Sequence, residues 1–329
     1  MPVSTALLAE VAVGIVALYT LITAAGTVVD RSLSLAQHYG VPEILIGMTV
    51  LAIGTSLPEL SSHVIASLGI ASGALDREIG SALVLGGNMG SSTLQQTLLL
   101  GLLVVGYGRL EFSRSFERAS YLPMLLALAL TLAVAVDGTV SRLDGVVLLV
   151  AYGAYLYYSY HRRERAPSLP GAASTNVRRD AAVAAGGLVL VLLAATLLLA
   201  VAQLVVEALA LGGSMIGVVT IGMAAALPEL STVLDAIRRR APNVALGTLV
   251  GSNVVNPLLG IGLGGAISTY TVPQPVIVWD LPFKLLVGVG LWAFVRYRSD
   301  GVVTRRAGAT LVVLYFVFIS VRLVLFPAQ

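Results

Sequence analysis

Ten long apolar segments run through the sequence, and they constrain its fold more than any other feature. An α-helix needs about 20 apolar residues to cross the ~30 Å hydrocarbon core of a bilayer. Outer-membrane barrels use short alternating segments instead, so unbroken apolar runs favour helices. The segments lie at residues 5–29, 43–72, 79–107, 120–137, 143–160, 181–211, 213–237, 243–268, 273–295 and 304–326. We therefore expect an all-α membrane protein with ten transmembrane helices.

Composition indicates the same class. Only 11% of the 329 residues are charged, whereas about 25% is usual in soluble domains, and this excludes a water-soluble globule. The sequence has no cysteine, so it holds no disulfide, no thiolate metal site and no cysteine nucleophile. It also lacks the P-loop lysine motif and the H-E-x-x-H motif, so we expect neither an enzyme nor a resident cofactor.

The arginines indicate how the chain sits in the membrane, because basic residues are retained on the cytoplasmic side. With the N-terminus outside, only Arg77, Arg142, Lys284 and Arg322 are left for the outer side. The inner loops receive the other sixteen of the twenty Lys and Arg residues: Arg31, Arg109, Arg114, Arg118, Arg162, Arg163, Arg165, Arg178, Arg179, Arg238, Arg239, Arg240, Arg296, Arg298, Arg305 and Arg306. We therefore predict that the protein lies in the plasma membrane and that both termini are on its outer side. Because these bases anchor the topology, we expect no nucleic-acid partner, and nothing implies a protein partner.

A hydrophilic stretch divides the ten segments into two sets of five. Residues 161–180 are rich in Pro, Ser, Gly and Arg and are predicted to form a cytoplasmic linker. The predicted organisation is a first five-helix repeat at residues 1–160, the linker, and a second repeat at residues 181–329. Because five is an odd number, corresponding helices run in opposite directions, so the repeats are inverted.

Two sequence blocks recur in the same order in both sets. Ile46-Gly47 and the L-P-E-L-S block at residues 57–61 return 170 positions later as Ile216-Gly217 and L-P-E-L-S at residues 227–231. Gly86 and Gly90-Ser91 return 161 positions later as Gly247 and Gly251-Ser252. The sequence therefore predicts a true internal repeat on the second and third helix of each set.

Each first block places a glutamate well inside an apolar segment. A central acidic residue costs roughly 2.5–3.5 kcal/mol on membrane-insertion scales, so Glu59 and Glu229 need a compensating partner. The proline before each glutamate lacks an N–H and frees the carbonyl four residues back, at Gly54 or Ala224. Such carbonyl oxygens, together with carboxylates and hydroxyls, are the ligands that hard cations such as calcium and sodium prefer.

Further polar side chains are predicted to lie near these glutamates. Thr55 and Ser56 add two hydroxyls to the first copy. On the next helix Ser91 and Gln95, and in the second half Ser252 and Asn256, are spaced i and i+4 and share one helical face. We expect these faces to line the same cavity as the glutamates.

The two blocks resemble the alpha repeats of the cation/calcium exchanger superfamily. The similarity is to its sodium/calcium exchanger branch, of the prokaryotic type with two alpha repeats. It rests on G-T-S-L-P-E at residues 54–59 and on G-S-N at residues 251–253. It implies alternating access, with calcium and sodium as transported ions, Glu59 and Glu229 as shared carboxylates, and helices 1 and 6 sliding past the core. The implied ion ligands are Glu59, Glu229, Thr55, Ser56, Ser91, Ser252, Asn256, Gln95, Gly54 and Ala225.

Two departures from the family pattern leave the counter-ion open. Ala225 and Ala226 stand where the second repeat is expected to carry hydroxyls, so a sodium site is lost or weakened. Gln95 and Asn256 are both neutral, which leaves only two central carboxylates. Without a bound cation, protons could compete for these two groups. A proton-coupled or other divalent-cation antiporter is therefore the alternative, and a passive cation channel or a non-transporting scaffold is the second.

Several of these residues also have a purely structural interpretation. The spacing of Gly86 and Gly90 is typical of close helix packing. Ser91, Ser252 and Asn256 could form hydrogen bonds between helices. For His63, one turn beyond Glu59, a packing or hydrogen-bonding role is favoured over a ligand role.

Overall fold

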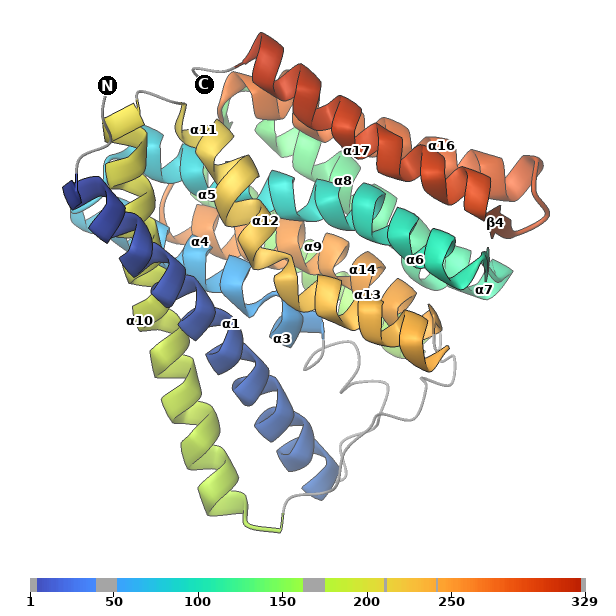
Figure 1. Cartoon of the computed structure of the whole chain (residues 1–329), viewed down its shortest axis with the longest axis horizontal. Helices are drawn as coiled ribbons and strands as arrows, with labels where there is room; N and C mark the ends of the chain where they lie inside the picture. Colours follow the sequence, from blue (N-terminus) through green and yellow to red (C-terminus); the bar gives the residue numbers. More distant parts are fainter. Residues whose placement is uncertain (1–4, 40–51, 162–174, 210–211, 241, 327–329) are drawn as a thin grey trace.

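The computed structural model describes residues 5–39, 52–161, 175–209, 212–240 and 242–326, and most of them are helical (Figure 1). The first half contains α1 (Thr5–His38), α3 (Ala52–Thr55), α4 (Leu57–Ser72), α5 (Arg77–Leu94), η2 (Gln95–Leu99), α6 (Leu100–Tyr107), β1 (Arg109–Glu111), α7 (Arg114–Phe116), η3 (Glu117–Tyr121), α8 (Leu122–Ala135), β2 (Thr139–Val140) and α9 (Arg142–His161). The second half contains α10 (Val177–Leu209), α11 (Gly213–Ile216), η4 (Gly217–Ile221), α12 (Gly222–Ala225), α13 (Leu227–Arg239), α14 (Pro242–Val255), η5 (Asn256–Ile261), α15 (Gly262–Ile267), β3 (Tyr270–Thr271), η6 (Val276–Asp280), α16 (Leu281–Tyr297), β4 (Val302–Thr304) and α17 (Arg305–Leu325). Elements marked η are short π-helical stretches set into longer helices.

Seven helices in the described parts of the chain are long and apolar enough to cross a membrane. The count rises to eight if the bent pair Gly213–Ala225 and Leu227–Arg238 forms one span. The prediction of a mainly helical membrane protein is confirmed, whereas the described residues contain seven or eight of the ten predicted transmembrane helices. Residues 43–51 of the second predicted segment, with the Ile46-Gly47 motif, lie outside the described residues, and so do residues 162–174 of the predicted linker.

Two helices are broken just before a proline. The backbone at Ser56 (φ −90°, ψ 7°) and at Ala226 (φ −83°, ψ 3°) leaves the α-helical region. Pro58 and Pro228 therefore occupy the first turn of α4 and α13, where a missing N–H is tolerated. Inside an unbroken helix each proline would remove a hydrogen bond and clash with the preceding turn. Each break lies directly before the Pro-Glu pair that the sequence analysis singles out in each half.

Helix α5 packs backbone against backbone on the continuous segment α11, η4 and α12. A Cβ on Gly86 or on Gly90 of α5 would clash with the main chain of Ser214 or Val218. Gly222 approaches the backbone of Ser91 equally closely. The small-residue spacing of Gly86 and Gly90 thus serves close helix packing, as one of its two interpretations predicts. This contact holds Ser91 against the broken helix of the second half.

Two short antiparallel sheets join the halves. Strand β1 pairs with β4, with Leu110 opposite Val303, and β2 pairs with β3, with Val140 opposite Tyr270. In each sheet one strand comes from the first half and one from the second. The sheets therefore connect loops that lie far apart in the sequence.

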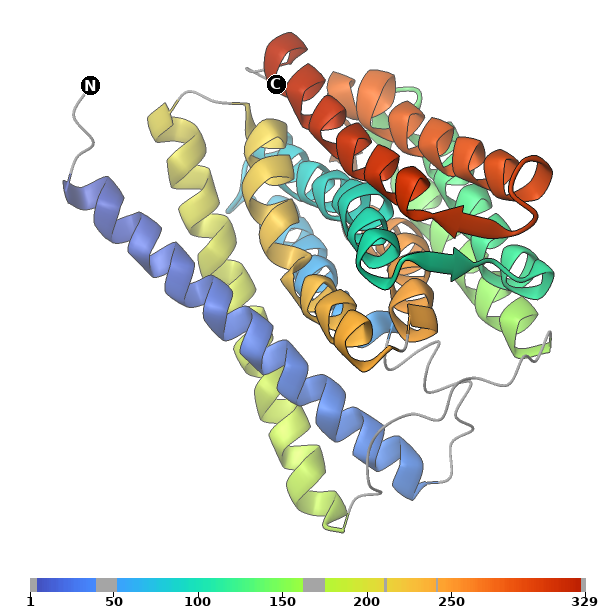
Figure 2. The same cartoon turned by 45° about the vertical axis from the view of Figure 1, so that its right-hand side comes forward.

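Helices α1 and α10 form a long pair at one side of the molecule, whereas α16 and α17 lie at the opposite side (Figures 1 and 2). The pair has its own small apolar cluster, in which Leu21 of α1 packs among Val191 and Ala195 of α10. Leu57 and Ile65 of α4 are the partly buried residues of the first half packed against this cluster. The pair therefore has a buried cluster distinct from the main apolar core, and Ile65 packs against both.

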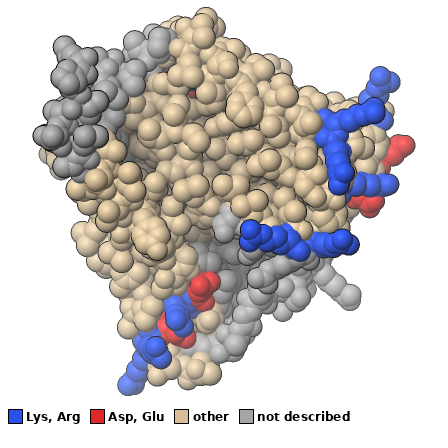
Figure 3. Space-filling view, in the orientation of Figure 1, with Lys and Arg blue, Asp and Glu red and all other residues tan. Residues whose placement is uncertain are grey.

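Charged residues are unevenly distributed over the surface. On the face seen in Figure 3 the blue and red atoms gather at the lower and right-hand margins, and a broad uncharged area separates them from the opposite margin. At the lower end of the α1 and α10 pair, Arg31 forms an ion pair with Asp180, with Nη1 and Oδ1 3.1 Å apart. This distribution is typical of a helical membrane protein with most of its bases on one side.

Lys284 of α16 and Arg322 of α17, two of the four bases left for the outer side, lie inside helices. Their side chains are buried inside the helix bundle, at 1% and 0% exposure, together with Asp280 at 0%. Arg322 forms an ion pair with Asp280, with Nε and Oδ1 3.2 Å apart, and donates to the hydroxyl of Ser214. Lys284 Nζ donates to the hydroxyl of Ser92 at 2.5 Å. The sequence analysis did not predict this buried cluster, in which one acid and two hydroxyls contact the two bases.

We expect Asp280→Ala to destabilise the protein strongly, because it leaves two buried bases without their acid. Breaking a buried ion pair by removing one partner costs about 3–5 kcal/mol. Thermal unfolding of the purified protein in detergent measures the effect. The triple variant Asp280→Leu, Lys284→Met and Arg322→Met removes all three charges together and should unfold close to the wild-type temperature. An Asp280→Ala variant as stable as the wild type would contradict this account.

Candidate cation site

The two breaks place both glutamates at the start of a helix. Glu59 lies in the first turn of α4 and Glu229 in the first turn of α13. Both side chains are buried, at 4% and 0% exposure. A helix N-terminus carries a partial positive charge, which stabilises a nearby carboxylate. The helix break therefore supplies part of the compensation that a buried carboxylate needs, and the sequence analysis did not foresee this source.

A serine from the following helix donates to each carboxylate. Ser91 Oγ of α5 donates to Glu59 Oε1 at 2.6 Å. Ser252 Oγ of α14 donates to Glu229 Oε1 at 3.2 Å. Gln95 Nε2 in turn donates to Ser91 Oγ at 3.1 Å, as expected for residues on one helical face. The structure thus brings together the two glutamates and the two serines that the repeat predicts.

Three contacts join the halves at this point. The hydroxyls of Thr55 and Ser252 lie 3.3 Å apart. Asn253 Nδ2 donates to Gln95 Oε1 at 3.1 Å, and Asn88 Nδ2 donates to the main-chain oxygen of Asn256 at 2.9 Å. The sequence analysis gave neither Asn88 nor Asn253 a site role. Asn88 lies three residues before Ser91, and Asn253 lies directly after Ser252, both on predicted apolar helices. An amide side chain so close to a predicted site serine was the signal that could have identified them.

Several buried oxygen atoms at the site lack a hydrogen-bond partner among the described residues. They are Glu59 Oε2, Glu229 Oε2, Ser56 Oγ, Asn253 Oδ1 and Asn256 Oδ1. Buried polar atoms without a partner are rare in folded proteins and call for an explanation. Carboxylate, hydroxyl and amide oxygens are the donor set that hard cations prefer. The charges of Glu59 and Glu229 also act on each other, so a cation held between them would relieve repulsion.

The two halves contribute different groups at the break. In the first half Gly54 and Ser56 are buried there, and Thr55 reaches Ser252 of the other half. In the second half Ala225 and Ala226 occupy the matching positions, buried at 4% and 1% exposure, and bring no hydroxyl. The two breaks are therefore asymmetric, and the break in the second half offers fewer side-chain oxygens.

His63 belongs to a hydrogen-bond network next to the site. Asn88 Nδ2 donates to His63 Nε2 at 3.0 Å, so Nδ1 carries the ring proton and donates to the Tyr270 hydroxyl at 3.2 Å. The Tyr270 hydroxyl also lies 2.6 Å from Ser67 Oγ. These contacts join α4 to β3 and give His63 the bonded role that the sequence favours.

The family follows from a comparison with known proteins. A family model described as sodium/calcium exchanger protein matches residues 10–161 and 180–324. The chain belongs to the sodium/calcium exchanger protein family. It is therefore an integral membrane protein of a transporter family, and the resemblance carried by the two L-P-E blocks is confirmed.

Individual relatives match along most of the chain. Sodium/calcium exchanger MaX1 of Methanosarcina acetivorans is 24% identical over 335 residues, covering 89% of this chain and 92% of its own length. Inner membrane protein YrbG of Escherichia coli is 27% identical over 309 residues, covering 90% and 91%. A solved structure of the sodium-calcium exchanger NCX_Mj matches with a TM-score of 0.64 at 24% identity, over 95% of this chain and 99% of that one. The helical arrangement is thus the fold of that exchanger.

Proposed function

We propose that this protein is a secondary-active cation antiporter that exchanges sodium for calcium by alternating access. One observation carries the proposal. Two buried carboxylates, Glu59 and Glu229, start half-helices from opposite halves of the chain, and each keeps one oxygen without a partner among the described residues. A divalent cation balances both charges and uses both free oxygens.

The proposed ligands are the groups gathered around these carboxylates. Hydroxyls come from Thr55, Ser56, Ser91 and Ser252, and amide oxygens come from Gln95 and Asn256. Gly54 and Ala225 would contribute main-chain carbonyl oxygens, because neither has a side-chain oxygen. Glu59 and Glu229 are the shared ligands for calcium or sodium in turn.

The proposed architecture is two inverted five-helix repeats, at residues 1–160 and 181–329, with the linker at 161–180 between them. The family model matches in two stretches whose gap falls in this linker. Each half carries a π-helical stretch at the corresponding place, η2 beginning at Gln95 and η5 at Asn256. By its place in the chain, β1 of the first half corresponds to β3 of the second, and β2 corresponds to β4. The sheet of β1 and β4 is therefore the counterpart of the sheet of β3 and β2, which also supports the repeat.

Alternating access needs one part of the protein to move against the other. The α1 and α10 pair is the proposed moving part, because its apolar cluster is separate from the main core. Both ends of the chain are proposed to lie on the outer side of the plasma membrane, and the linker is proposed to lie in the cytoplasm. The concentration of arginines in the predicted inner loops supports this orientation.

A proton-coupled antiporter is the second candidate, and a specific observation favours it. Ala225 and Ala226 remove two hydroxyls from the second half, and the site has only two carboxylates. Among the described residues no cluster of three or more His, Cys, Asp or Glu side chains is placed to hold a metal ion. A site with two acids offers less electrostatic support for several sodium ions than for one divalent ion or for protons.

A gradient-swap flux experiment distinguishes these functions. Calcium-45 uptake into proteoliposomes should be driven by an outward sodium gradient and should persist when the pH is equal on both sides. Uptake driven by a pH gradient and indifferent to sodium would replace sodium by protons as the counter-ion. Calcium flux that follows only its own gradient would indicate a passive channel, and no flux at all would indicate a scaffold.

Glu59→Gln and Glu229→Gln should each reduce sodium-driven calcium uptake by more than about tenfold, because losing one charged ligand removes about 1.5–3 kcal/mol of binding free energy. The amide keeps the shape of the side chain and can still accept from the serine. Glu117→Gln is the matched control, since Glu117 is also buried, at 4% exposure, but lies in η3. Near-normal uptake by either site variant, in protein that elutes as the wild type does, would refute the proposed site.

The double variant Ala225→Thr and Ala226→Ser restores the two hydroxyls that the second half lacks. We expect half-maximal calcium exchange at a lower sodium concentration, because sodium gains oxygen ligands. Ala236→Ser is the control, since Ala236 is buried at 5% exposure on α13 about three turns beyond the break. An unchanged sodium response would mean that these positions do not supply the sodium ligands.

A further inference from the structure

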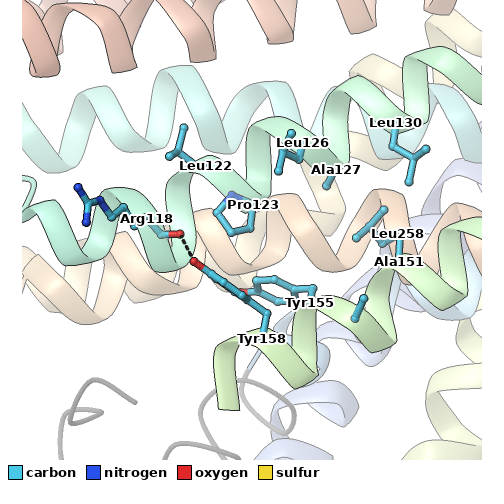
Figure 4. A pocket seen from close by; sticks show the side chains of 11 residues that line it. Arg118, Leu122, Pro123, Leu126, Ala127, Leu130, Ala151, Tyr155, Tyr158 and Leu258 are labelled. Carbon is cyan, nitrogen blue, oxygen red and sulfur yellow. Dashed lines mark hydrogen bonds between the residues drawn. The ribbon is translucent and has the colours of Figure 1, made fainter. Parts of the chain in front are cut away.

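A groove with a volume of about 590 Å³ lies between α8 and α9, outside the cation site. One wall is formed by Leu122, Leu126 and Leu130 of α8, one turn apart (Figure 4). The other wall includes Ala154 and Tyr158 of α9. Leu258 of η5 also lines the groove. The lining is therefore apolar over most of its length.

The groove is on the part of the surface that faces lipid. Leu126 is 70% exposed on α8, and Val150 and Tyr157 of α9 are 66% and 68% exposed. Large apolar side chains with such exposure on transmembrane helices contact acyl chains. In the membrane, lipid chains therefore reach the open side of this groove.

Arg118 of η3 lies at one end of the groove, and the residue is exposed and forms no ion pair within the described residues. Its guanidinium extends beyond this end, away from the other lining side chains (Figure 4). The Tyr158 hydroxyl donates to the main-chain oxygen of Arg118 at 3.2 Å and holds the end of α9 against η3 (Figure 4). Guanidinium groups bind phosphate oxygens with charge-assisted and often paired hydrogen bonds. An apolar trough that ends at an unpaired guanidinium matches the shape and charge of an anionic phospholipid.

We infer that this groove binds an anionic phospholipid, with its phosphate on Arg118 and an acyl chain along α8 and α9 as far as Leu258. Leu258 lies two positions after Asn256 in η5. The acyl chain therefore packs on the helical turn that carries a proposed cation ligand. Lipid binding does not depend on which ion is exchanged, so the inference stands apart from the proposed function.

Native mass spectrometry of the detergent-purified protein, with equal amounts of phosphatidylglycerol and phosphatidylcholine added, tests the headgroup. The wild type should retain phosphatidylglycerol at about tenfold excess, the factor that corresponds to one charge-assisted contact. Arg118→Gln should abolish the preference. Arg114→Gln is the matched control, because Arg114 lies on the preceding turn, is exposed, and does not line the groove. Equal retention of the two lipids by the wild type, or an unchanged preference in Arg118→Gln, would overturn the inference.

A second pair of variants tests the trough. Ala154→Phe fills it from an exposed position and should reduce the retention of phosphatidylglycerol about tenfold, whereas Val150→Phe, which faces lipid outside the groove, should not. Equal retention by both variants would show that the acyl chain lies elsewhere. Displacement of phosphatidylglycerol by inorganic phosphate alone would show that Arg118 binds phosphate without any contribution from the groove, and this result would overturn the inference. All of these results measure binding, so a failed transport assay would leave them unaffected.

Discussion

The cost of holding two carboxylates inside a bilayer is the constraint on which the rest of the structure depends. Each central acid costs roughly 2.5–3.5 kcal/mol on insertion scales, and two neighbouring acids also repel each other. The protein offsets this cost by ending a helix and starting a new one just before each glutamate. The break accommodates a proline in the first turn of the new helix, and it exposes main-chain groups that a closely packed neighbour must cover inside a bilayer.

The close neighbour is the reason for the glycines of α5. Gly86 and Gly90 let α5 approach the main chain of α11 and η4 in the second half. Directly after Gly90 on the same helix, Ser91 donates to Glu59 of α4 in the first half. Helix α5 therefore packs against the broken helix of one half and holds a hydroxyl against the carboxylate of the other.

The long apolar segments were sufficient to predict the helical membrane class, and the repeated blocks were sufficient to predict that the two glutamates and their serine partners come together. These features depend on local spacing, such as proline next to glutamate and serine four residues from an amide. The buried cluster of Asp280, Lys284 and Arg322 was not predictable in the same way. Asp280 and Arg322 are 42 positions apart in the sequence, and Ser214 and Arg322 are 108 positions apart. A count of charges along the chain does not reveal this cluster, because tertiary pairing leaves no local signal.

The two halves do not carry the same side chains at positions that correspond in sequence. Leu122-Pro123 of the first half corresponds in sequence to Leu281-Pro282 of the second. The residues just before these pairs are Tyr121 and Asp280, so a buried aromatic hydroxyl in one half takes the place of a buried acid in the other. Thr55 contributes a hydroxyl where Ala225 contributes none. Both halves contribute to the same proposed cation site, so this difference in side chains makes the contribution of hydroxyl oxygens unequal between them.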